Sequence, residues 1–352
     1  MAPAKLSLKI KKINMQNAAP SRDYTLARKI MLYVMQYRRI AGTKKSCATS
    51  GCEACLTPHL GQVISAIESK QPIIFALPAF PAKSPNPAKV LGILPDMAEQ
   101  LALQFLNHLC QQIQKIYSPG ARIILSSDGR VFNDAIGIDD RNVSDYQQAL
   151  SLLIQKMSFT FISTFNLDDF YSSRDFNQIR QQLMMQYGEP LEILKEAVRK
   201  GNQKPCSREE EEIHRQYCGI TKFLVEDAMH PGQRLSRSAI QKECRQRAYI
   251  VIQRSRAWSE LIAKHFPHAL RLSIHPQSCG SSKLGIRLME AENWMTPWHG
   301  VAVDIDGRFA LLKRAQAEKL GAHLVYREGQ PSHYQLISAE KNLELKEILY
   351  GT

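Results

Sequence analysis

Alternation of strands and helices begins at Ile73-Ile74-Phe75-Ala76-Leu77-Pro78, an apolar, β-favouring run that a proline ends. Because no polar side chain interrupts it, the run predicts a short strand buried on both faces of a sheet. A helix is expected next, with Pro95 in its first turn, a single apolar face and an end at Ser118-Pro119-Gly120. Residues 121–125 then predict a second strand.

The same alternation continues further along the chain. Ser144 and Gln147 form a capping-box pattern that predicts a helix running through Lys156, and residues 159–165 again favour a strand. Residues 174–265 are largely helical in pattern, and further strands are expected at 269–274, 285–289, 301–305 and 323–326. This order predicts an α/β fold, with a Rossmann-like, mainly parallel sheet, helices on both faces, helical insertions and a smaller C-terminal α/β part.

A length of 352 residues suggests about two domains, with the clearest candidate break at 201–206. We predict an N-terminal helical segment with a cysteine cluster over residues 1–60 and a Rossmann-like core over 61–200. Residues 201–352 are expected to supply a helical insertion and C-terminal strands that complete the active site.

Composition narrows the class of protein. Hydrophobic residues make up 44% and charged residues 22% of the chain, as in ordinary globular proteins. No apolar run of signal-peptide or membrane-helix length is visible, so a cytoplasmic protein without a membrane partner is expected. The net charge of +13 favours anionic partners. Because the basic residues are spread along the chain without a recognisable nucleic-acid module, nucleic acid is not the expected partner.

The loop after the first strand, residues 78–89, combines rigidity with positive charge. Four prolines restrict its backbone, and Lys83, Ser84, Asn86 and Lys89 offer hydrogen-bond donors. Ligands of parallel sheets bind outside the carboxyl ends of the strands, so this loop is a candidate clamp for a phosphate or carboxylate. The alternative is a stiff solvent loop with hydrated lysines. A Walker loop is excluded because the glycines are missing.

Acidic side chains follow both of the first two strands. Asp96 and Glu99 lie three residues apart at a predicted helix start, where they either complement the helix dipole or bind an amine and move a proton. Asp128 and Arg130 belong to a predicted flexible turn after the second strand. They offer another carboxylate and a guanidinium for an anion, or they are only parts of a turn.

The C-terminal part adds candidates for an aromatic pocket. Trp298 and His299 lie in a Trp-Thr-Pro-Trp-His cluster that either lines such a pocket with a titratable imidazole or caps the surface. His275 and Lys283 precede this cluster, and Arg256 on a predicted helix could pair with a substrate carboxylate.

Cysteines are concentrated near the N-terminus. Cys47, Cys52, Cys55 and His59 follow the spacing C-x4-C-x2-C-x3-H, which is compatible with a tetrahedral structural zinc. An iron–sulfur cluster is disfavoured because no fourth thiol follows at the right distance in the sequence. Reduced cytosolic thiols without metal are the alternative.

Several separated motifs together resemble one known family. In chain order they are Ala76-Leu77-Pro78-Ala79-Phe80-Pro81-Ala82-Lys83-Ser84-Pro85-Asn86, Lys89-Val90-Leu91-Gly92, Pro95-Asp96-Met97-Ala98-Glu99, Ser127-Asp128-Gly129-Arg130-Val131-Phe132, Arg271-Leu272-Ser273-Ile274-His275-Pro276, Lys283-Leu284-Gly285-Ile286, Thr296-Pro297-Trp298-His299 and Pro331-Ser332-His333. This set resembles the pyoverdine/dityrosine biosynthesis family, the PvcA-type isocyanide synthases.

The resemblance implies an isocyanide synthase of secondary metabolism. Such an enzyme converts the amine of L-tyrosine or L-tryptophan into an isocyanide and takes the added carbon from ribulose 5-phosphate as co-substrate. No metal or organic cofactor is implied. The usual pathway partner is a non-haem iron, 2-oxoglutarate-dependent oxygenase that oxidises the product.

Mechanistic roles follow as hypotheses from this resemblance. Lys83 and Lys89 would hold the sugar phosphate, Asp96, Glu99, Asp128 and His275 would move protons, and Arg130 and Lys283 would stabilise oxyanions. Alternatively, Lys83 forms a Schiff base with the ketose, which requires a lowered lysine pKa. The rival classes are another α/β transferase acting on a phosphorylated metabolite and a non-catalytic basic binding protein.

Overall fold

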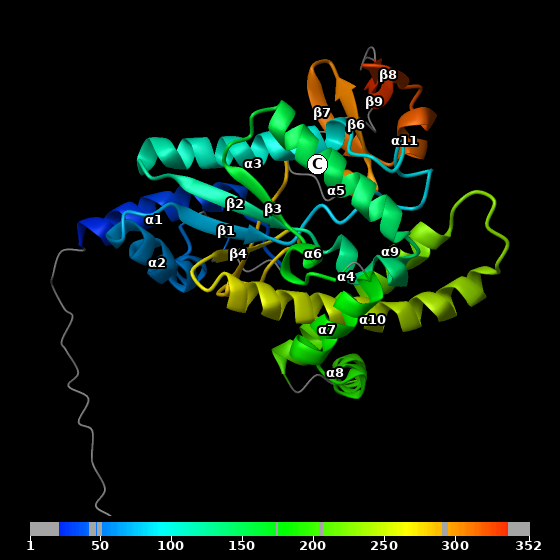
Figure 1. Ribbon diagram of the computed structural model, residues 1–352, viewed down its shortest axis with the longest axis horizontal. Helices are drawn as coiled ribbons and strands as arrows, with labels where there is room; N and C mark the ends of the chain where they lie inside the picture. Colours follow the sequence, from blue (N-terminus) through cyan, green and yellow to red (C-terminus); the bar gives the residue numbers. More distant parts are fainter. Residues whose placement is uncertain are drawn as a thin grey trace, which may run out of the picture.

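A computed structural model describes residues 21–41, 47, 51–173, 175–203, 207–290 and 295–336 (Figure 1). Its centre is a sheet of five parallel strands in the order β3-β2-β1-β4-β5. These strands are β1 (Ile73–Leu77), β2 (Ala121–Ser126), β3 (Ile162–Phe165), β4 (Leu270–Ser273) and β5 (Lys283–Gly285). The predicted α/β class with a mainly parallel sheet is confirmed.

The connections between the strands create a topological switch point at the carboxyl edge of this sheet, between β1 and β4. Helix α3 (Met97–Ile116) connects β1 to β2, whereas α10 (Arg237–His265) leads back across the sheet into β4. In Figure 1, α3 lies above the sheet and α10 below it. The strand order therefore reverses direction between β1 and β4, and the carboxyl ends of these two strands flank the position where such folds bind ligands.

Further helices surround the sheet. They are α1 (Arg22–Val34), α2 (Glu53–Glu68), α4 (Gly129–Ile136), α5 (Asp140–Lys156), α6 (Leu167–Phe170), α7 (Phe176–Tyr187), α8 (Leu191–Gln203) and α9 (Arg208–Ala228). The helical pattern predicted for residues 174–265 is confirmed in the described part of that range. Helices α8 and α9 flank the candidate domain break and pack closely, since a Cβ added to Gly201 would lie 2.2 Å from the Glu210 carbonyl oxygen.

A smaller sheet follows, in the order β7-β6-β9-β8. It comprises β6 (Val301–Ile305), β7 (Arg308–Leu312), β8 (His323–Arg327) and β9 (Gln330–Leu336), with α11 (Arg314–Lys319) between β7 and β8. The strand predicted at 285–289 was wrong: β5 ends at Gly285, after which Ile286 forms only an isolated bridge with Arg38. Gly285 lies so close to the Arg39 carbonyl that a Cβ would be 2.4 Å from that oxygen.

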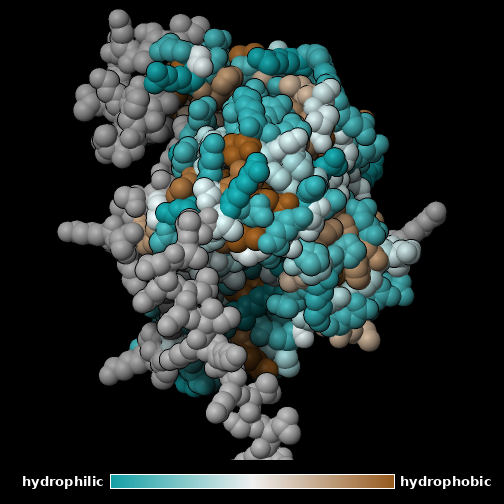
Figure 2. Space-filling view, turned by 90° about the vertical axis from the view of Figure 1, so that its left-hand side faces the viewer, coloured by the Kyte–Doolittle hydropathy of each residue, from teal (hydrophilic) through white to brown (hydrophobic). Residues whose placement is uncertain are grey.

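One large core holds the main sheet and its helices together. Ile30 of α1, Phe75 of β1 and Trp258 of α10 are each at most 1% exposed and belong to this core. The Trp258 indole N–H also donates to the Ser126 carbonyl, at 3.2 Å, which ties α10 to the end of β2. Where it is not grey, the face in Figure 2 is mainly hydrophilic, with hydrophobic residues confined to a few areas. Within the described ranges, no helix is long and apolar enough for a membrane span.

Candidate active site

The loop after β1 leaves the sheet in a fixed conformation. Phe80 adopts a φ of 58°, which is uncommon for a non-glycine residue and costs on the order of 1–3 kcal/mol unless its surroundings enforce it. Its ring is buried against Trp298, with centroids 5.2 Å apart, and its carbonyl accepts a hydrogen bond from the Ser127 hydroxyl at 3.0 Å. The predicted rigidity of the loop therefore comes from packing as well as from its prolines.

The loop after β2 packs directly onto the loop after β1. A Cβ on Gly129 would lie 1.9 Å from the Pro81 carbonyl oxygen, so this close approach requires glycine. The flexible turn predicted at residues 128–130 was wrong, because Gly129 opens α4 and Asp128 is its N-cap residue. The two candidate loops thus form one continuous edge beyond the sheet.

Lys83 lies at the centre of this edge, between two carboxylates. Its Nζ is 2.8 Å from Asp96 Oδ2, 2.7 Å from Glu99 Oε2 and 3.2 Å from the Pro297 carbonyl oxygen. The Lys83 and Glu99 side chains are 0% exposed and the Asp96 side chain is 4% exposed. The structure therefore joins three predicted site residues in one buried ionic group.

Asp96 also forms the start of α3. Its Oδ1 accepts from the Ala98 N–H at 2.8 Å, while the Asp96 N–H donates to Glu99 Oε2 at 3.0 Å, which completes a capping box. The helix therefore begins at Met97, two residues after Pro95. Asp96 and Glu99 therefore support the helix start, in line with one of the two alternatives, and they also pair with Lys83. Binding of a substrate amine and proton transfer stay predictions.

The protonation of this group is unusual. Burial raises the pKa of Glu99 to about 7, although the Lys83 charge opposes this effect. Burial alone would lower the pKa of Lys83, but Asp96 and Glu99 outweigh it and the pKa is raised. Tyr146 of α5 donates to Glu99 Oε1 at 3.2 Å, and burial together with this carboxylate keeps the pKa of its phenol well above 10.0. Lys83 is thus held charged, while Glu99 is able to exchange a proton near neutral pH.

A second ionic group lies further along the same loop. Lys89 Nζ is 2.5 Å from Asp227 Oδ1, and the Ser84 hydroxyl donates to that same oxygen at 2.7 Å. The Asn86 amide donates to the Glu226 carbonyl at 2.9 Å. Helix α9 therefore closes over the loop. Asp227, only 2% exposed, was missed in the sequence, because an acidic pair near a helix end carries no periodic signal of burial.

His299 and Trp298 form the wall opposite the loop, on the short 3₁₀ helix η3 (Pro297–His299). The Trp298 carbonyl accepts from the Ser84 N–H at 2.8 Å, and His299 Nε2 lies 3.9 Å from Asp227 Oδ2. Burial lowers the pKa of His299 to about 3, with the charges of Lys89 and Lys83 acting in the same direction. His299 is therefore a neutral imidazole at working pH.

His275 follows β4 on the other side of the switch point and is exposed to solvent. Although part of its side chain reaches solvent, the protein around the imidazole desolvates it and lowers its pKa. The charges of Arg39 and Lys283 add to this effect. His275 is also near enough to help lower the pKa of His299. The structure thus brings Lys83, Asp96 and His275 to the same side of the molecule, with the two imidazoles at its more exposed margin.

Asp128, another predicted site residue, lies in the loop after β2 that packs against Pro81. Burial raises its pKa to about 7, and its Oδ1 is buried without a hydrogen-bond partner among the described residues. An unpartnered buried carboxyl oxygen is costly to keep charged, which is the reason for the raised pKa.

Two arginines proposed for substrate binding are engaged within the fold. Arg130 is 1% exposed and donates to Asp140 Oδ1 at 2.9 Å and to the Ser144 hydroxyl at 2.7 Å. Arg256 pairs with Glu189 at 2.6 Å. The capping box predicted at Ser144 was wrong, because α5 begins four residues earlier, at Asp140, and the Ser144 hydroxyl is used by Arg130 instead.

Lys283 contacts a hydroxyl group, whereas Lys83 and Lys89 pair with carboxylates. Its Nζ contacts the Ser259 hydroxyl at 3.0 Å, and Arg271 contacts the same hydroxyl at 3.0 Å. Burial lowers the pKa of Lys283, with the Arg271 charge adding to it. Within the described ranges no carboxylate lies at ion-pair distance from either cation. This pair is a candidate contact for an anionic group.

The geometry can support acid–base chemistry on an amine. It offers the charged Lys83, the carboxyls of Glu99 and Asp128 with a pKa of about 7, and the neutral imidazole of His299. The aromatic ring of Trp298 lies beside them. Such groups, converging at the carboxyl edge of a parallel sheet, are typical of an enzyme active site.

Comparisons with known proteins agree with this view. Residues 63–325 match the family described as pyoverdine/dityrosine biosynthesis protein. The chain is 45% identical over 315 residues to an L-tryptophan isonitrile synthase of Fischerella ambigua, covering 88% of this chain and 95% of that one. It is 46% identical over 319 residues to an L-tyrosine isonitrile synthase of Pseudomonas aeruginosa, covering 89% and 94%. The crystal structure of PvcA from Pseudomonas aeruginosa superimposes with a TM-score of 0.82 at 46% identity, over 89% of this chain and all of that one.

Proposed function

The chain belongs to the pyoverdine/dityrosine biosynthesis family, and from this premise we propose how it acts as an isocyanide synthase. Its substrate is an aromatic amino acid, L-tyrosine or L-tryptophan, whose α-amine becomes the isocyanide. Ribulose 5-phosphate donates the added carbon as a co-substrate, without a bound organic cofactor. The product is then oxidised by a separate non-haem iron, 2-oxoglutarate-dependent oxygenase.

The observation that carries this proposal is the buried group of Lys83, Asp96 and Glu99. Condensation of an amine with the keto carbon of the sugar requires a base to take a proton from the ammonium group and an acid to expel water. Glu99, with a pKa of about 7, exists in both forms near neutral pH. When Glu99 takes up that proton, Lys83 keeps only one charged carboxylate partner, so its ammonium group can stabilise the oxyanion that develops on the keto oxygen.

The same geometry supports a non-covalent role for Lys83. A lysine that attacks a ketose must be deprotonated, which requires a lowered pKa. Both carboxylates raise the pKa of Lys83 instead. We therefore propose that the imine forms on the substrate amine. After borohydride treatment with ribulose 5-phosphate, the intact mass of the protein should be unchanged.

The sugar phosphate needs cations whose charge is not already matched. Lys83 and Lys89 both pair with carboxylates. Lys283 donates to the Ser259 hydroxyl and Arg271 to the Ser259 hydroxyl and carbonyl, and within the described ranges neither cation has a carboxylate at ion-pair distance. They therefore support phosphate binding better on electrostatic grounds. Lys283→Ala should raise the KM for ribulose 5-phosphate at least about tenfold, and Lys89→Ala should raise it less, in keeping with the ~1.5–3 kcal/mol of a charged hydrogen bond.

The deciding experiment supplies L-tyrosine, L-tryptophan and ribulose 5-phosphate carrying ¹³C at the keto carbon. The proposal predicts a labelled isocyanide, trapped by a tetrazine and read by mass spectrometry, from one or both amino acids. An unlabelled isocyanide would refute the carbon source. Absence of product with every aromatic amino acid would refute the substrate class.

A further inference from the structure

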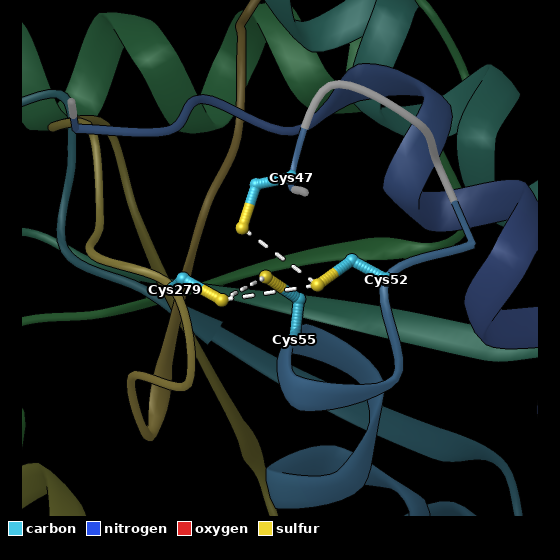
Figure 3. Close-up of side chains that lie close together, drawn as sticks. All are labelled: Cys47, Cys52, Cys55 and Cys279. Atoms are coloured by element: carbon cyan, nitrogen blue, oxygen red, sulfur yellow. Dashed lines mark hydrogen bonds between the residues drawn. The ribbon is translucent and has the colours of Figure 1, made fainter. Parts of the chain in front are cut away.

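Three cysteines near the N-terminus, Cys47, Cys52 and Cys55, lie next to Cys279 from a distant part of the sequence. Cys52 is the N-cap residue of α2, Cys55 lies in the first turn of that helix, and Cys279 comes from the loop between β4 and β5. Figure 3 shows their sulfur atoms pointing toward one another and toward Cys47. All four Sγ atoms lie within 4.8 Å of one another.

The distances match those of ligands around a single metal ion. The Sγ–Sγ distance is 3.7 Å for Cys47 and Cys52, 3.8 Å for Cys52 and Cys279, and 3.5 Å for Cys55 and Cys279. Four thiolates at a Zn–S distance of ~2.3 Å in a tetrahedron have their sulfurs ~3.8 Å apart. The thiols are therefore already placed as such an ion requires.

We propose that Cys47, Cys52, Cys55 and Cys279 bind one structural Zn²⁺ ion. This ligand set corrects the one predicted from sequence, in which His59 was the fourth ligand. His59 is outside the group of atoms that converge, and Cys279 takes its place. Sequence spacing could not reveal this fourth ligand, because Cys279 lies more than 200 residues after Cys55. The two become neighbours only through the folding of the sheet.

The start of a helix and a nearby positive charge suit a negatively charged zinc–thiolate centre. Two of the ligands lie at the N-terminal end of α2, where the helix dipole favours thiolates. The Cys55 N–H donates to the Cys52 carbonyl at 3.0 Å, which fixes the first turn that carries both thiols. The Arg38 guanidinium donates to the Cys47 carbonyl. Gly280 adopts a φ of 80°, which a glycine accommodates without strain as the chain turns after Cys279.

Other occupants of the cluster fit less well. A disulfide holds two sulfurs at ~2.05 Å and would satisfy only pairs of these cysteines, all of which are free thiols here. An iron–sulfur cluster places several irons and sulfides between its four cysteines and so separates their sulfurs more widely than a single ion does. The compact set of four sulfurs is therefore best suited to one tetrahedral ion, and zinc is the usual occupant of a Cys₄ site.

The ion would connect the N-terminal segment to the active-site margin. The loop that carries Cys279 also carries His275. This loop is already bound to the N-terminal segment, because the Gln277 N–H donates to the Arg39 carbonyl at 3.1 Å. Zinc at the cluster would add a cross-link between α2 and this loop. We therefore assign the ion a positioning role for the loop, with no contact to the substrate.

The test measures zinc in full-length protein purified without chelator or added metal. About one zinc per chain is expected by inductively coupled plasma mass spectrometry. Cys279→Ser and Cys55→Ser should lower this to a few tenths at most. Two matched controls, His59→Asn at the sequence-predicted ligand and Cys110→Ala at a buried cysteine of α3 outside the cluster, should keep full zinc.

A second measurement does not depend on the folding of any variant. Titration of the wild-type protein with an organomercurial should release zinc in step with the blocking of four thiols, followed with a zinc-sensitive dye. Protein reconstituted with Co²⁺ should show the thiolate-to-cobalt absorption typical of four sulfur ligands.

Three results would overturn the proposal. The first is wild-type protein with under a few tenths of a zinc and freely reactive thiols. The second is stoichiometric iron with visible absorption. The third is zinc that survives Cys279→Ser but is lost in His59→Asn.

Discussion

Two buried cations, Lys83 and Arg130, follow the first two strands of the same sheet, yet the structure uses them differently. Lys83 lies between Asp96 and Glu99, both buried, at the point where the strand order reverses. Arg130 bonds to Asp140, whose side chain is 31% exposed, and its guanidinium stacks on Phe176 at 3.7 Å. The pairing geometry is similar, and the surroundings of the partner acids differ.

The pKa of each partner acid expresses this difference. Burial raises the pKa of Glu99 to about 7. Burial also acts on Asp140, but hydrogen bonds from Arg180 and Arg130 outweigh it and the pKa is lowered. Two buried carboxylates share the single cation Lys83, so one of them, Glu99, can be protonated near neutral pH. Two cations share the single carboxylate of Asp140, so Asp140 stays charged and holds both arginines.

The largest effect is expected for Lys83→Met. Loss of the fixed charge at the developing oxyanion should lower kcat/KM by about 10³-fold, the scale seen when one oxyanion donor is removed. Stability should fall less than for an ordinary broken buried pair, because Glu99 can take up a proton. Steady-state kinetics and thermal unfolding of the same sample measure both. A Lys83→Met enzyme with near-normal kcat/KM would place the chemistry elsewhere.

Arg130→Lys should give the opposite pattern. A lysine keeps the charge but loses the forked contacts to Asp140 and Ser144, so stability should fall by about 3 kcal/mol. The kcat/KM of the folded fraction should stay within a few-fold of the wild type. A large loss of activity at normal stability would make Arg130 a substrate-binding residue after all.

Asp140→Asn tests the role of the Arg130 partner through the pH dependence of the free energy of unfolding. Because the folded-state pKa of Asp140 lies below its unfolded value, the carboxylate stabilises the fold above about pH 4 and this stability is lost on acidification through the folded-state pKa. The difference in unfolding free energy between wild type and Asp140→Asn should therefore be large at pH 7 and shrink below about pH 4. Urea titrations over pH 3–7 measure it, and a constant difference would contradict the role.

Gly129→Ala tests the contact between the two loops. The added methyl group would overlap the Pro81 carbonyl, so the loops must separate, at a cost of about 1–3 kcal/mol. We expect kcat/KM to fall together with the melting temperature. A control, Gly61→Ala on α2, has open space around its Cβ, so it should leave kcat/KM unchanged. It should raise the melting temperature slightly, because alanine favours a helix interior over glycine.

A smaller effect is expected in the pH profile of the wild type and Tyr146→Phe. If the Glu99 carboxylate accepts the substrate proton, kcat/KM should rise with pH and level off above about pH 7. Removal of the Tyr146 hydroxyl, which stabilises that carboxylate, should move the limb to higher pH. Asp128 also has a pKa of about 7 and could produce the same limb. Because we assign the limb to Glu99, it should persist in Asp128→Asn. Disappearance of the limb in that variant would assign it to Asp128.

The sequence was informative wherever the signal is local. Apolar runs predicted β1 and β2, the prolines predicted the rigid loop that carries Lys83, and the order of elements predicted the parallel sheet. Ser144 shows the limit, because its spacing to Gln147 imitates a helix start while the structure uses its hydroxyl to bind Arg130.

Residues that depend on tertiary neighbours were beyond local reasoning. Asp227, Tyr146 and Cys279 come from segments far from their partners, and only the sheet order and the packing of α9 and α5 bring them there. The same reason explains why β7 and β9 were not predicted, since they are defined by pairing with β6.

The central claim is most directly tested by label transfer in three proteins side by side. Wild type, Lys83→Met and Arg130→Lys are supplied with L-tyrosine, L-tryptophan and ribulose 5-phosphate labelled at the keto carbon, and the labelled isocyanide is quantified per folded molecule. Wild type and Arg130→Lys should form it at comparable rates, and Lys83→Met should form almost none. Equal label transfer by Lys83→Met, or none by the wild type, would contradict the account.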